Sequence, residues 1–137
     1  MDCIFCRIIN GEIPSYKFYE DEDMIAILDI SQATKGHALL IPKTHCRNLY
    51  ELDENLAQRL FKKLPRLANA LKRAFDPIGL NIIINTEKPL QSVFHFHIHL
   101  IPRYESDNFI IEAPAQKREI SKDAYLTILD KIKKELK

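Results

Sequence analysis

The sequence predicts an α+β domain in which a mostly antiparallel sheet is covered on one face by helices. Three observations predict this class: short apolar runs with strand character, short loops between them, and two stretches with helical periodicity. The 137 residues are enough for one domain of ordinary size and too few for two. No repeat, low-complexity segment or linker divides the chain, so we treat residues 1–137 as a single domain.

Five strands are expected, at 16–19, 24–28, 37–41, 80–85 and 93–101. The first two flank the acidic turn 20–23, which is typical of a β-hairpin. The third is an apolar run that ends at Pro42. Because the connections are short, neighbouring strands are expected to run antiparallel.

Two helices are expected, one long and one at the end of the chain. Residues 54–75 carry an apolar residue at every third or fourth position, which predicts one buried helix face. Pro65 lies inside this stretch and lacks the N–H that would bond the carbonyl of Phe61, so a bend or an interruption is expected there. Ser121 is a suitable N-cap for a closing helical extension over 121–136. This extension is expected to bury one stripe: Tyr125, Ile128, Leu129, Ile132 and Leu136.

Charge and hydropathy exclude several classes of function. Lys and Arg together number 20 against 19 Asp and Glu, so no overall field favours nucleic acid or an anionic membrane. No apolar run approaches the roughly 20 residues of a membrane span, and residues 1–7 contain no signal-peptide core. A cytoplasmic protein is expected, and its binding must come from a local site.

The most informative stretch holds three histidines that alternate with apolar residues. His95, His97 and His99 would share one face of a strand, while the residues between them pack on the other. Three of the five histidines in the chain lie there. Two kinds of chemistry fit this row: a His-x-His pair could hold a catalytic zinc with bound water, or a neutral imidazole could attack a phosphorus centre. The row alone does not choose between them.

The cysteines suggest metal binding more than disulfides. There are three of them in a chain without an export signal, which disfavours a disulfide framework. Cys3 and Cys6 have the CxxC spacing of metal ligands or of a redox pair, although no thioredoxin-like βαβ pattern surrounds them. Cys46 is expected to be a packed thiol and not a ligand.

Taken together, these motifs resemble the HIT (histidine triad) family of nucleotide hydrolases and transferases, in particular its bacterial members. Residues 95–101 match the signature His-φ-His-φ-His-φ-φ, where φ is apolar. The resemblance covers about residues 3–104 and includes the stretches 3–9, 11–15, 28–31, 34–37, 41–45 and 79–82. It implies a HIT-like fold with one long helix and a C-terminal helix, and a homodimer built on the long helix and its strand neighbours.

The resemblance also implies roles for individual residues. His97 would be the nucleophile that attacks the α-phosphorus, and His99 and His37 would bond phosphoryl oxygens and help to protonate the leaving group. Nucleotide binding would fall to Asp29, Ile30, Asn85, Gln91 and Ser92. The carboxylate of Asp29 would accept hydrogen bonds from the ribose hydroxyls.

The implied activity is that of a nucleotidyl hydrolase, similar to the purine nucleoside phosphoramidase branch, with an AMP-type substrate and a nucleotidyl-histidine intermediate. Two alternatives remain: a dinucleoside polyphosphate hydrolase, and a nucleotide-binding regulator with little turnover. A structural zinc is implied at Cys3, Cys6, His45 and His95, with no open coordination position. The nucleophilic step itself needs no metal.

The loop before the histidine row departs from the family pattern. Relatives have a glycine soon after the asparagine and another just before the glutamine, whereas residues 85–93 contain none. Pro89 removes a backbone donor and Leu90 adds a side chain, which predicts a weakened phosphate cradle. The competing hypothesis is that the loop has its own geometry, with Gln91 or Thr86 supplying the missing donor.

Overall fold

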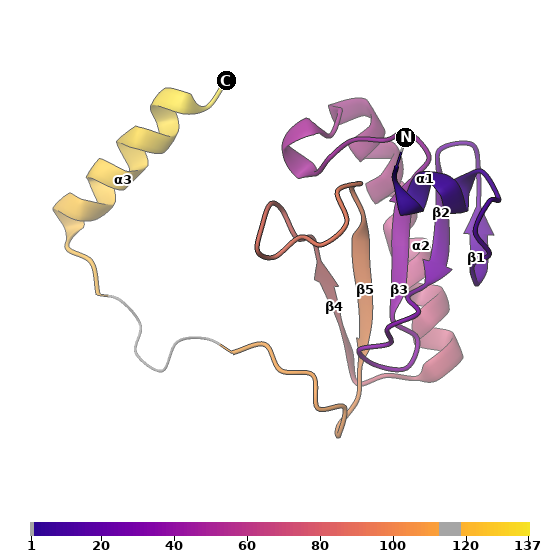
Figure 1. Cartoon of the computed structure of the whole chain (residues 1–137). Coiled ribbons are helices and arrows are strands. Elements are labelled where there is room, and N and C mark those ends of the chain that lie inside the picture. Colours follow the sequence, from indigo (N-terminus) through magenta and orange to yellow (C-terminus); the bar gives the residue numbers. More distant parts are fainter. Residues whose placement is uncertain (1, 113–118) are drawn as a thin grey trace.

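The computed structural model describes residues 2–112 and 119–137 and consists of one antiparallel sheet with three helices (Figure 1). The strand order is β1-β2-β3-β5-β4. The strands are β1 (Lys17–Glu20), β2 (Met24–Leu28), β3 (Ala38–Pro42), β4 (Gly79–Ile83) and β5 (Ile98–Arg103). The helices are α1 (Ile4–Ile9), α2 (Glu54–Phe75) and α3 (Lys122–Glu135), with a short 3₁₀ turn at Leu49–Glu51. The predicted α+β class is confirmed.

The expected hairpin is present, but the last strand is shorter than predicted. β1 pairs antiparallel with β2, as the acidic turn indicated. β5 begins at Ile98 and not at residue 93. The reason lies in the backbone before it: the N–H of Phe96 donates to the carbonyl of Cys46 (2.8 Å) and the carbonyl of His95 accepts from the ring of His97 (2.7 Å). These groups are therefore not part of a β-ladder.

The main core lies between α2 and one face of the sheet. The apolar stripe of α2 is buried as the sequence predicted, through Leu56, Leu60, Leu67 and Leu71. It packs against Met24, Leu40, Phe96, Ile98 and Leu100. Each such side chain contributes about 1.5–3 kcal/mol on burial. Phe96, Ile98 and Leu100 thereby fix the apolar side of the histidine row on the core.

The opposite face of the sheet carries a second, smaller core under α1. Phe5 and Cys3 pack there against Ile25, Ile27, Leu39 and Ile41. The prediction of helices on one face only was therefore wrong. With six residues, α1 is too short to show helical periodicity in the sequence. Its N-cap is Cys3, whose sulfur accepts from the backbone N–H of Cys6 (3.4 Å).

The long helix is not interrupted at its proline. α2 runs from Glu54 to Phe75 with Pro65 inside it, so the expected interruption is absent from this fully described helix. Pro65 and Phe61 both lie on the exposed side, where water can satisfy the carbonyl that lost its partner. The helix is capped at its start by the carboxylate of Asp53, which accepts from the N–H of Leu56 (3.1 Å).

The closing helix forms as predicted but does not bury its apolar stripe. Ser121 is the N-cap of α3, and its hydroxyl accepts from the N–H of Ala124 (3.1 Å). The five stripe residues are 44–78% exposed, so the predicted burial was wrong. Figure 1 gives the reason: α3 lies apart from the sheet, on the side of β4, and covers no part of it. Among the helices of the described residues, none is long and apolar enough to cross a membrane.

Candidate active site and metal centre

Four of the predicted site residues meet at the start of β5. His97 and His99 lie at its beginning, with ring centroids 5.0 Å apart. His37, just before β3, brings its Nε2 to 2.9 Å from Nδ1 of His99. Asp29 follows β2 and holds one carboxylate oxygen 3.5 Å from the same nitrogen of His37. Neighbouring antiparallel strands therefore gather residues that are up to 70 positions apart in the sequence.

A backbone carbonyl fixes the tautomer of His97. Its Nδ1 lies 2.7 Å from the carbonyl oxygen of His95, which can only accept, so Nδ1 carries the proton. Nε2 then keeps a free lone pair. Burial lowers the pKa of His97 below its usual value, which keeps the ring neutral at neutral pH. The ring also packs edge-on against Phe5, with centroids 4.9 Å apart, and this contact limits its rotation.

A backbone amide sets the opposite tautomer in His37. The N–H of Ala33 donates to Nδ1 of His37 (3.1 Å), so the proton of the neutral ring is on Nε2. That Nε2–H faces Nδ1 of His99, which accepts, and the proton of His99 is therefore on Nε2. Burial lowers the pKa of His37 and lowers that of His99 to about 4. His99 is thus a neutral ring that presents an N–H donor.

The proton on Nε2 of His37 argues against a metal site formed by Asp29, His37 and His99. Ligand atoms of Asp29, His37 and His99 lie within 4.8 Å of one another, a spacing that a cation could bridge. However, the nitrogen of His37 that faces the other two carries the proton, because its second nitrogen accepts from a backbone N–H. A protonated nitrogen has no lone pair for a metal. The cluster is therefore suited to hydrogen bonding.

A cavity of about 340 Å³ opens beside these histidines. This volume is within the range of small-molecule sites. Its walls are mainly apolar, from Ile4, Phe5, Ile8, Ile13, Ile27, Leu39 and Val93. Its polar residues are Ser15, Asp29, Ser31, Ser92, His97 and His99, and Ile30, also in its lining, is largely exposed. Of the predicted nucleotide-binding residues, Asp29, Ile30 and Ser92 line this cavity, whereas Asn85 and Gln91 are not part of its wall.

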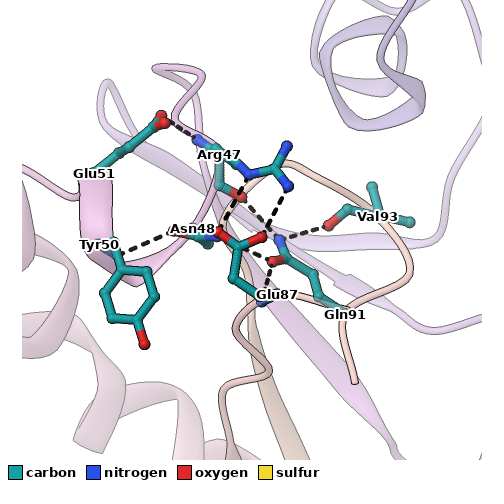
Figure 2. Close-up of polar contacts among 7 residues, drawn as sticks. All are labelled: Arg47, Asn48, Tyr50, Glu51, Glu87, Gln91 and Val93. Carbon is teal, nitrogen blue, oxygen red and sulfur yellow. Dashed lines mark hydrogen bonds and ion pairs between the residues drawn. The ribbon is translucent and has the colours of Figure 1, made fainter. Parts of the chain in front are cut away.

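Gln91 holds the glycine-free loop together through the hydrogen bonds of its side-chain amide (Figure 2). Its side chain is buried, and its Oε1 accepts from the N–H of Glu87 (2.9 Å) and from the amide of Asn48 (3.3 Å). Its Nε2 donates to the carbonyls of Arg47 (2.8 Å) and Val93 (3.0 Å). Both N–H groups of the amide are thus engaged within the protein.

Glu87 adopts a backbone conformation in this loop that usually requires glycine. Its φ is +66°, the left-handed region in which glycine is easily accommodated. Its carboxylate is 2.8 Å from the guanidinium of Arg47 and 3.0 Å from the amide of Asn48 (Figure 2). Leu90, in contrast, is 69% exposed. The loop therefore has its own geometry, as the second hypothesis states, but Gln91 does not supply the missing donor because both N–H groups of its amide are engaged within the protein.

Sequence reasoning missed Arg47 and Asn48. Asn48 is almost fully buried, and its side-chain oxygen also caps the 3₁₀ turn by accepting from the N–H of Tyr50 (3.1 Å). An Asn ahead of a short turn is too common a pattern to indicate this role. The absence of glycine from residues 85–93 was the available signal. A left-handed backbone position that is not occupied by glycine needs stabilising contacts from other residues, as Glu87 has here.

The predicted zinc ligands also come together, at the junction of α1 and the start of the histidine row. Nδ1 of His95 lies 3.4 Å from the sulfur of Cys3, 3.6 Å from that of Cys6 and 3.0 Å from Nδ1 of His45. Zinc bonds of about 2.3 Å to sulfur and 2.0–2.1 Å to nitrogen place tetrahedral ligand atoms roughly 3.3–3.8 Å apart. The observed spacing is close to this range.

The protonation of His95 also fits a metal ligand. Its Nε2 lies 2.8 Å from the carbonyl oxygen of Pro42 and therefore carries the proton, which leaves the Nδ1 lone pair directed at the cluster. Two thiolates and two imidazoles are the donor set of a closed structural zinc site. A zinc ion there would tie α1 to the segment that carries His97. Cys46 is outside this cluster of described ligands, and burial raises the pKa of its thiol, as expected for a packed cysteine.

The fold and the site together define a histidine-triad protein: an antiparallel sheet in which alternating histidines lead into the fifth strand, beside a fourth histidine and a carboxylate. A family model described as "HIT domain" matches residues 10–106, and the chain belongs to this family. "Protein hit" of Bacillus subtilis is 56% identical over 110 residues, which cover 79% of this chain and 76% of that protein. "Adenosine 5'-monophosphoramidase HNT1" of Saccharomyces cerevisiae is 40% identical over 136 residues, covering 98% and 80%.

Solved structures agree with the fold over almost the whole chain. The crystal structure of a HIT family member from Bacillus subtilis has a TM-score of 0.95 and 45% identity, covering 100% of this chain and 99% of that one. A HIT family protein from Bacillus anthracis has a TM-score of 0.94 and 42% identity, covering 99% and 98%. The predicted HIT-like fold is confirmed.

Proposed function

We propose that this protein is a nucleotidyl hydrolase that cleaves the bond between the α-phosphate of a purine nucleotide and an amine leaving group, through an intermediate on His97. The observation that carries the proposal is the protonation of His97: a neutral, buried ring whose Nδ1–H is held by a backbone carbonyl and whose Nε2 is free. Such a nitrogen is a nucleophile at neutral pH. It lines a cavity whose lining also contains the carboxylate of Asp29 and the N–H donor of His99.

The lining of the cavity supports a nucleotide as the ligand. The apolar side chains can enclose a base, and Asp29 retains lone pairs for ribose hydroxyls although Oδ1 already accepts from the N–H of Ser31 (2.7 Å). The Nε2–H of His99 is suited to a phosphoryl oxygen. The name of the yeast relative, an adenosine 5'-monophosphoramidase, favours adenosine as the nucleoside and nitrogen as the leaving atom.

The proposed reaction has two displacements. Nε2 of His97 forms a bond to phosphorus while the bond from phosphorus to the leaving nitrogen breaks. The leaving amine takes a proton from solvent, through a water molecule that accepts a hydrogen bond from the Nε2–H of His99, so that His99 stays neutral and the nucleotidyl-imidazolium ring on His97 carries the positive charge. Water then breaks the bond between phosphorus and His97, and its proton is released to solvent. The products are AMP and an amine.

The test is incubation with an adenosine phosphoramidate and, separately, with a diadenosine polyphosphate, followed by chromatography for AMP. We expect faster release of AMP from the phosphoramidate. Faster cleavage of the polyphosphate would favour the dinucleoside polyphosphate hydrolase instead. AMP binding without release from either compound would indicate a nucleotide-binding regulator. The guanosine and cytidine analogues of the preferred substrate test the preference for a purine.

We further propose that Cys3, Cys6, His45 and His95 hold a structural zinc. We expect elemental analysis of protein purified without chelators to give close to one zinc per chain. Cys6→Ser should remove the metal and lower the melting temperature more than it lowers the rate per folded molecule, because the site stabilises the fold and contributes no group to the reaction.

Cys46→Ser is the matched control, since this thiol is close in sequence to His45 but outside the cluster. It should retain the zinc. Metal-free protein from such a preparation, or equal loss of zinc in both variants, would contradict the proposed ligand set.

A further inference from the structure

The loop between β2 and β3 is built around the side chain of Gln32. Although this residue is exposed, its amide is bonded to the backbone of the loop at three points. Its Nε2 donates to the carbonyl oxygens of Asp29 and His37, and its Oε1 accepts from the N–H of Gly36 (2.9 Å). Both N–H donors and the oxygen of the amide are thus used. Gln32 therefore joins the two ends of the loop that carries Asp29 and His37.

The groups that set the proton of His37 come from the same loop. The N–H of Ala33 donates to Nδ1 of His37 (3.1 Å), so the proton of the neutral ring is on Nε2. A carboxylate oxygen of Asp29 lies 3.5 Å from this Nε2, and a carboxylate can only accept. Ala33 follows Gln32 directly, and Asp29 begins the loop. Both groups therefore depend on the closed shape that Gln32 gives the loop.

The proton of His37 decides what His99 offers to the cavity. Nε2 of His37 and Nδ1 of His99 are 2.9 Å apart, so one of them donates and the other accepts. When His37 donates, the neutral ring of His99 keeps its proton on Nε2. When His99 donates, its Nε2 has a lone pair instead. Because His99 lines the cavity, only the first arrangement gives a donor for a phosphoryl oxygen or for a water beside it.

The far end of the loop is anchored on the rest of the domain. The φ of Gly36 is +91°, and a Cβ at this position would lie 2.7 Å from the ring of Phe75, at the end of α2. The hydroxyl of Thr34 donates to the carbonyl of Pro102 in β5. Gln32 links the start of the loop to this anchored end. The side chain is thus placed to keep the N–H of the following residue on its acceptor.

We infer that Gln32 is a positioning residue: it holds the N–H of Ala33 on Nδ1 of His37 and thereby makes His99 a hydrogen-bond donor toward the cavity. Gln32 acts through these residues and does not line the cavity itself. The use of the donor on a phosphate rests on the proposed function, whereas the protonation of the two rings does not. Without Gln32, His37 should share its proton between its two nitrogens, and part of the molecules would turn a lone pair of His99 toward the cavity.

NMR of protein with ¹⁵N-labelled histidine rings tests the inference without any ligand, because the shifts of the ring nitrogens distinguish the tautomers. In the unmodified chain we expect the proton on Nε2 in His37 and His99. Gln32→Ala should move the nitrogen shifts of His37 toward the Nδ1–H form. Lys35→Ala, at an exposed neighbour in the same loop, is the matched control and should leave them unchanged. A folded Gln32→Ala protein whose His37 remains entirely in the Nε2–H form would overturn the inference.

A change to a single backbone atom gives a second test, which does not depend on how well Gln32→Ala folds. Replacement of Ala33 by lactic acid, through nonsense suppression, turns its N–H into an ester oxygen and keeps its methyl group. The donor to Nδ1 of His37 is then lost while Gln32 is present. We expect the nitrogen shifts of His37 to move at least as far as in Gln32→Ala. Unchanged shifts in this protein would show that another group sets the proton, and would reject the role of the loop.

Binding measurements connect the ring protonation to the phosphate. Calorimetric titration should show AMP binding to Gln32→Ala about three- to tenfold more weakly than to the unmodified chain, because part of the molecules lack the donor of His99. Adenosine has no phosphate and should bind both proteins alike. An equal loss of affinity for both ligands would indicate a distorted cavity and would contradict the positioning role. Failure of the unmodified chain to bind AMP would contradict the proposed function, and the NMR result would still decide the role of Gln32.

Discussion

We expect His97→Ala to reduce turnover of an adenosine phosphoramidate by roughly four orders of magnitude or more, while the affinity for AMP changes by less than about tenfold. The difference arises because the free Nε2 of His97 forms its bond to phosphorus only during the reaction, whereas binding rests on the cavity walls and on Asp29. Steady-state kinetics and calorimetric titration with AMP measure the two quantities.

Two further measurements separate the nucleophile from a structural role. Rapid quench of the unmodified protein with a labelled substrate should trap a nucleotide on His97, and mass spectrometry of the digested chain locates it. The melting temperature of His97→Ala should remain close to that of the unmodified chain. Appreciable turnover by a folded His97→Ala protein would exclude the covalent mechanism. Among the described residues, no other histidine of the cavity lining has a free Nε2 and an Nδ1–H held by a backbone carbonyl.

His99→Ala is expected to be less damaging than loss of the nucleophile. General acid–base contributions are typically about 10²–10⁴-fold, so the rate should fall within that range. The loss should be smaller for substrates with a better leaving group, because these need less protonation. Comparison of an alkyl amine with an aniline leaving group on the same nucleotide measures this. An equal loss for both substrates would assign His99 to phosphate binding alone.

The residues that meet at the site were predictable from the sequence because their side chains are imidazoles or a carboxylate and because they lie at or near the ends of predicted strands. Alternation along residues 95–101 was enough to place the histidines on one side and Phe96, Ile98 and Leu100 in the core. The protonation states were not predictable, since they depend on backbone groups brought near by folding. Nothing in the sequence indicates that the N–H of Ala33 donates to His37 or that the carbonyl of Pro42 accepts from His95.

The fold was predictable where the periodicity is long, and the prediction was wrong where an element is short or where the domain leaves a helix face uncovered. The boundaries of α2 agree with the apolar pattern at 54–75. The six residues of α1 are too few for a pattern, although they carry Cys6 and build the second core. The stripe on α3 was correctly recognised as one face of a helix, but periodicity does not reveal which surface covers that face.

The loop of residues 85–93 shows how a chain can do without a glycine. Adopting a left-handed backbone at Glu87 costs of order 1 kcal/mol for a residue with a side chain. Hydrogen bonds from Arg47 and Asn48 to its carboxylate offset this cost, and the same contacts lower its pKa. Gln91 then connects the loop to Val93, which lines the cavity. The loop is thus a support for the cavity wall.

We therefore expect Gln91→Ala to lower both the stability and the rate. It removes the amide that joins the backbone of Glu87, Arg47 and Val93, and each buried group left without a partner costs about 1–3 kcal/mol. Partial access of water to the loop reduces the total, so a loss of about 2–4 kcal/mol and a melting temperature lower by roughly 8–15 °C are expected. Displacement of Ser92 and Val93 should lower kcat/KM about tenfold.

Two other variants decide why Gln91 matters. Gln91→Glu has nearly the same shape but loses both N–H donors and sets a carboxylate against two carbonyl oxygens, so it should be about as unstable as Gln91→Ala if the hydrogen bonds are responsible. Leu90→Ala alters the exposed neighbour and should change neither stability nor rate appreciably. If Gln91 instead contacts the nucleotide, Gln91→Ala would keep its melting temperature and lose AMP affinity alone, and that result would assign it to the binding site and not to the loop.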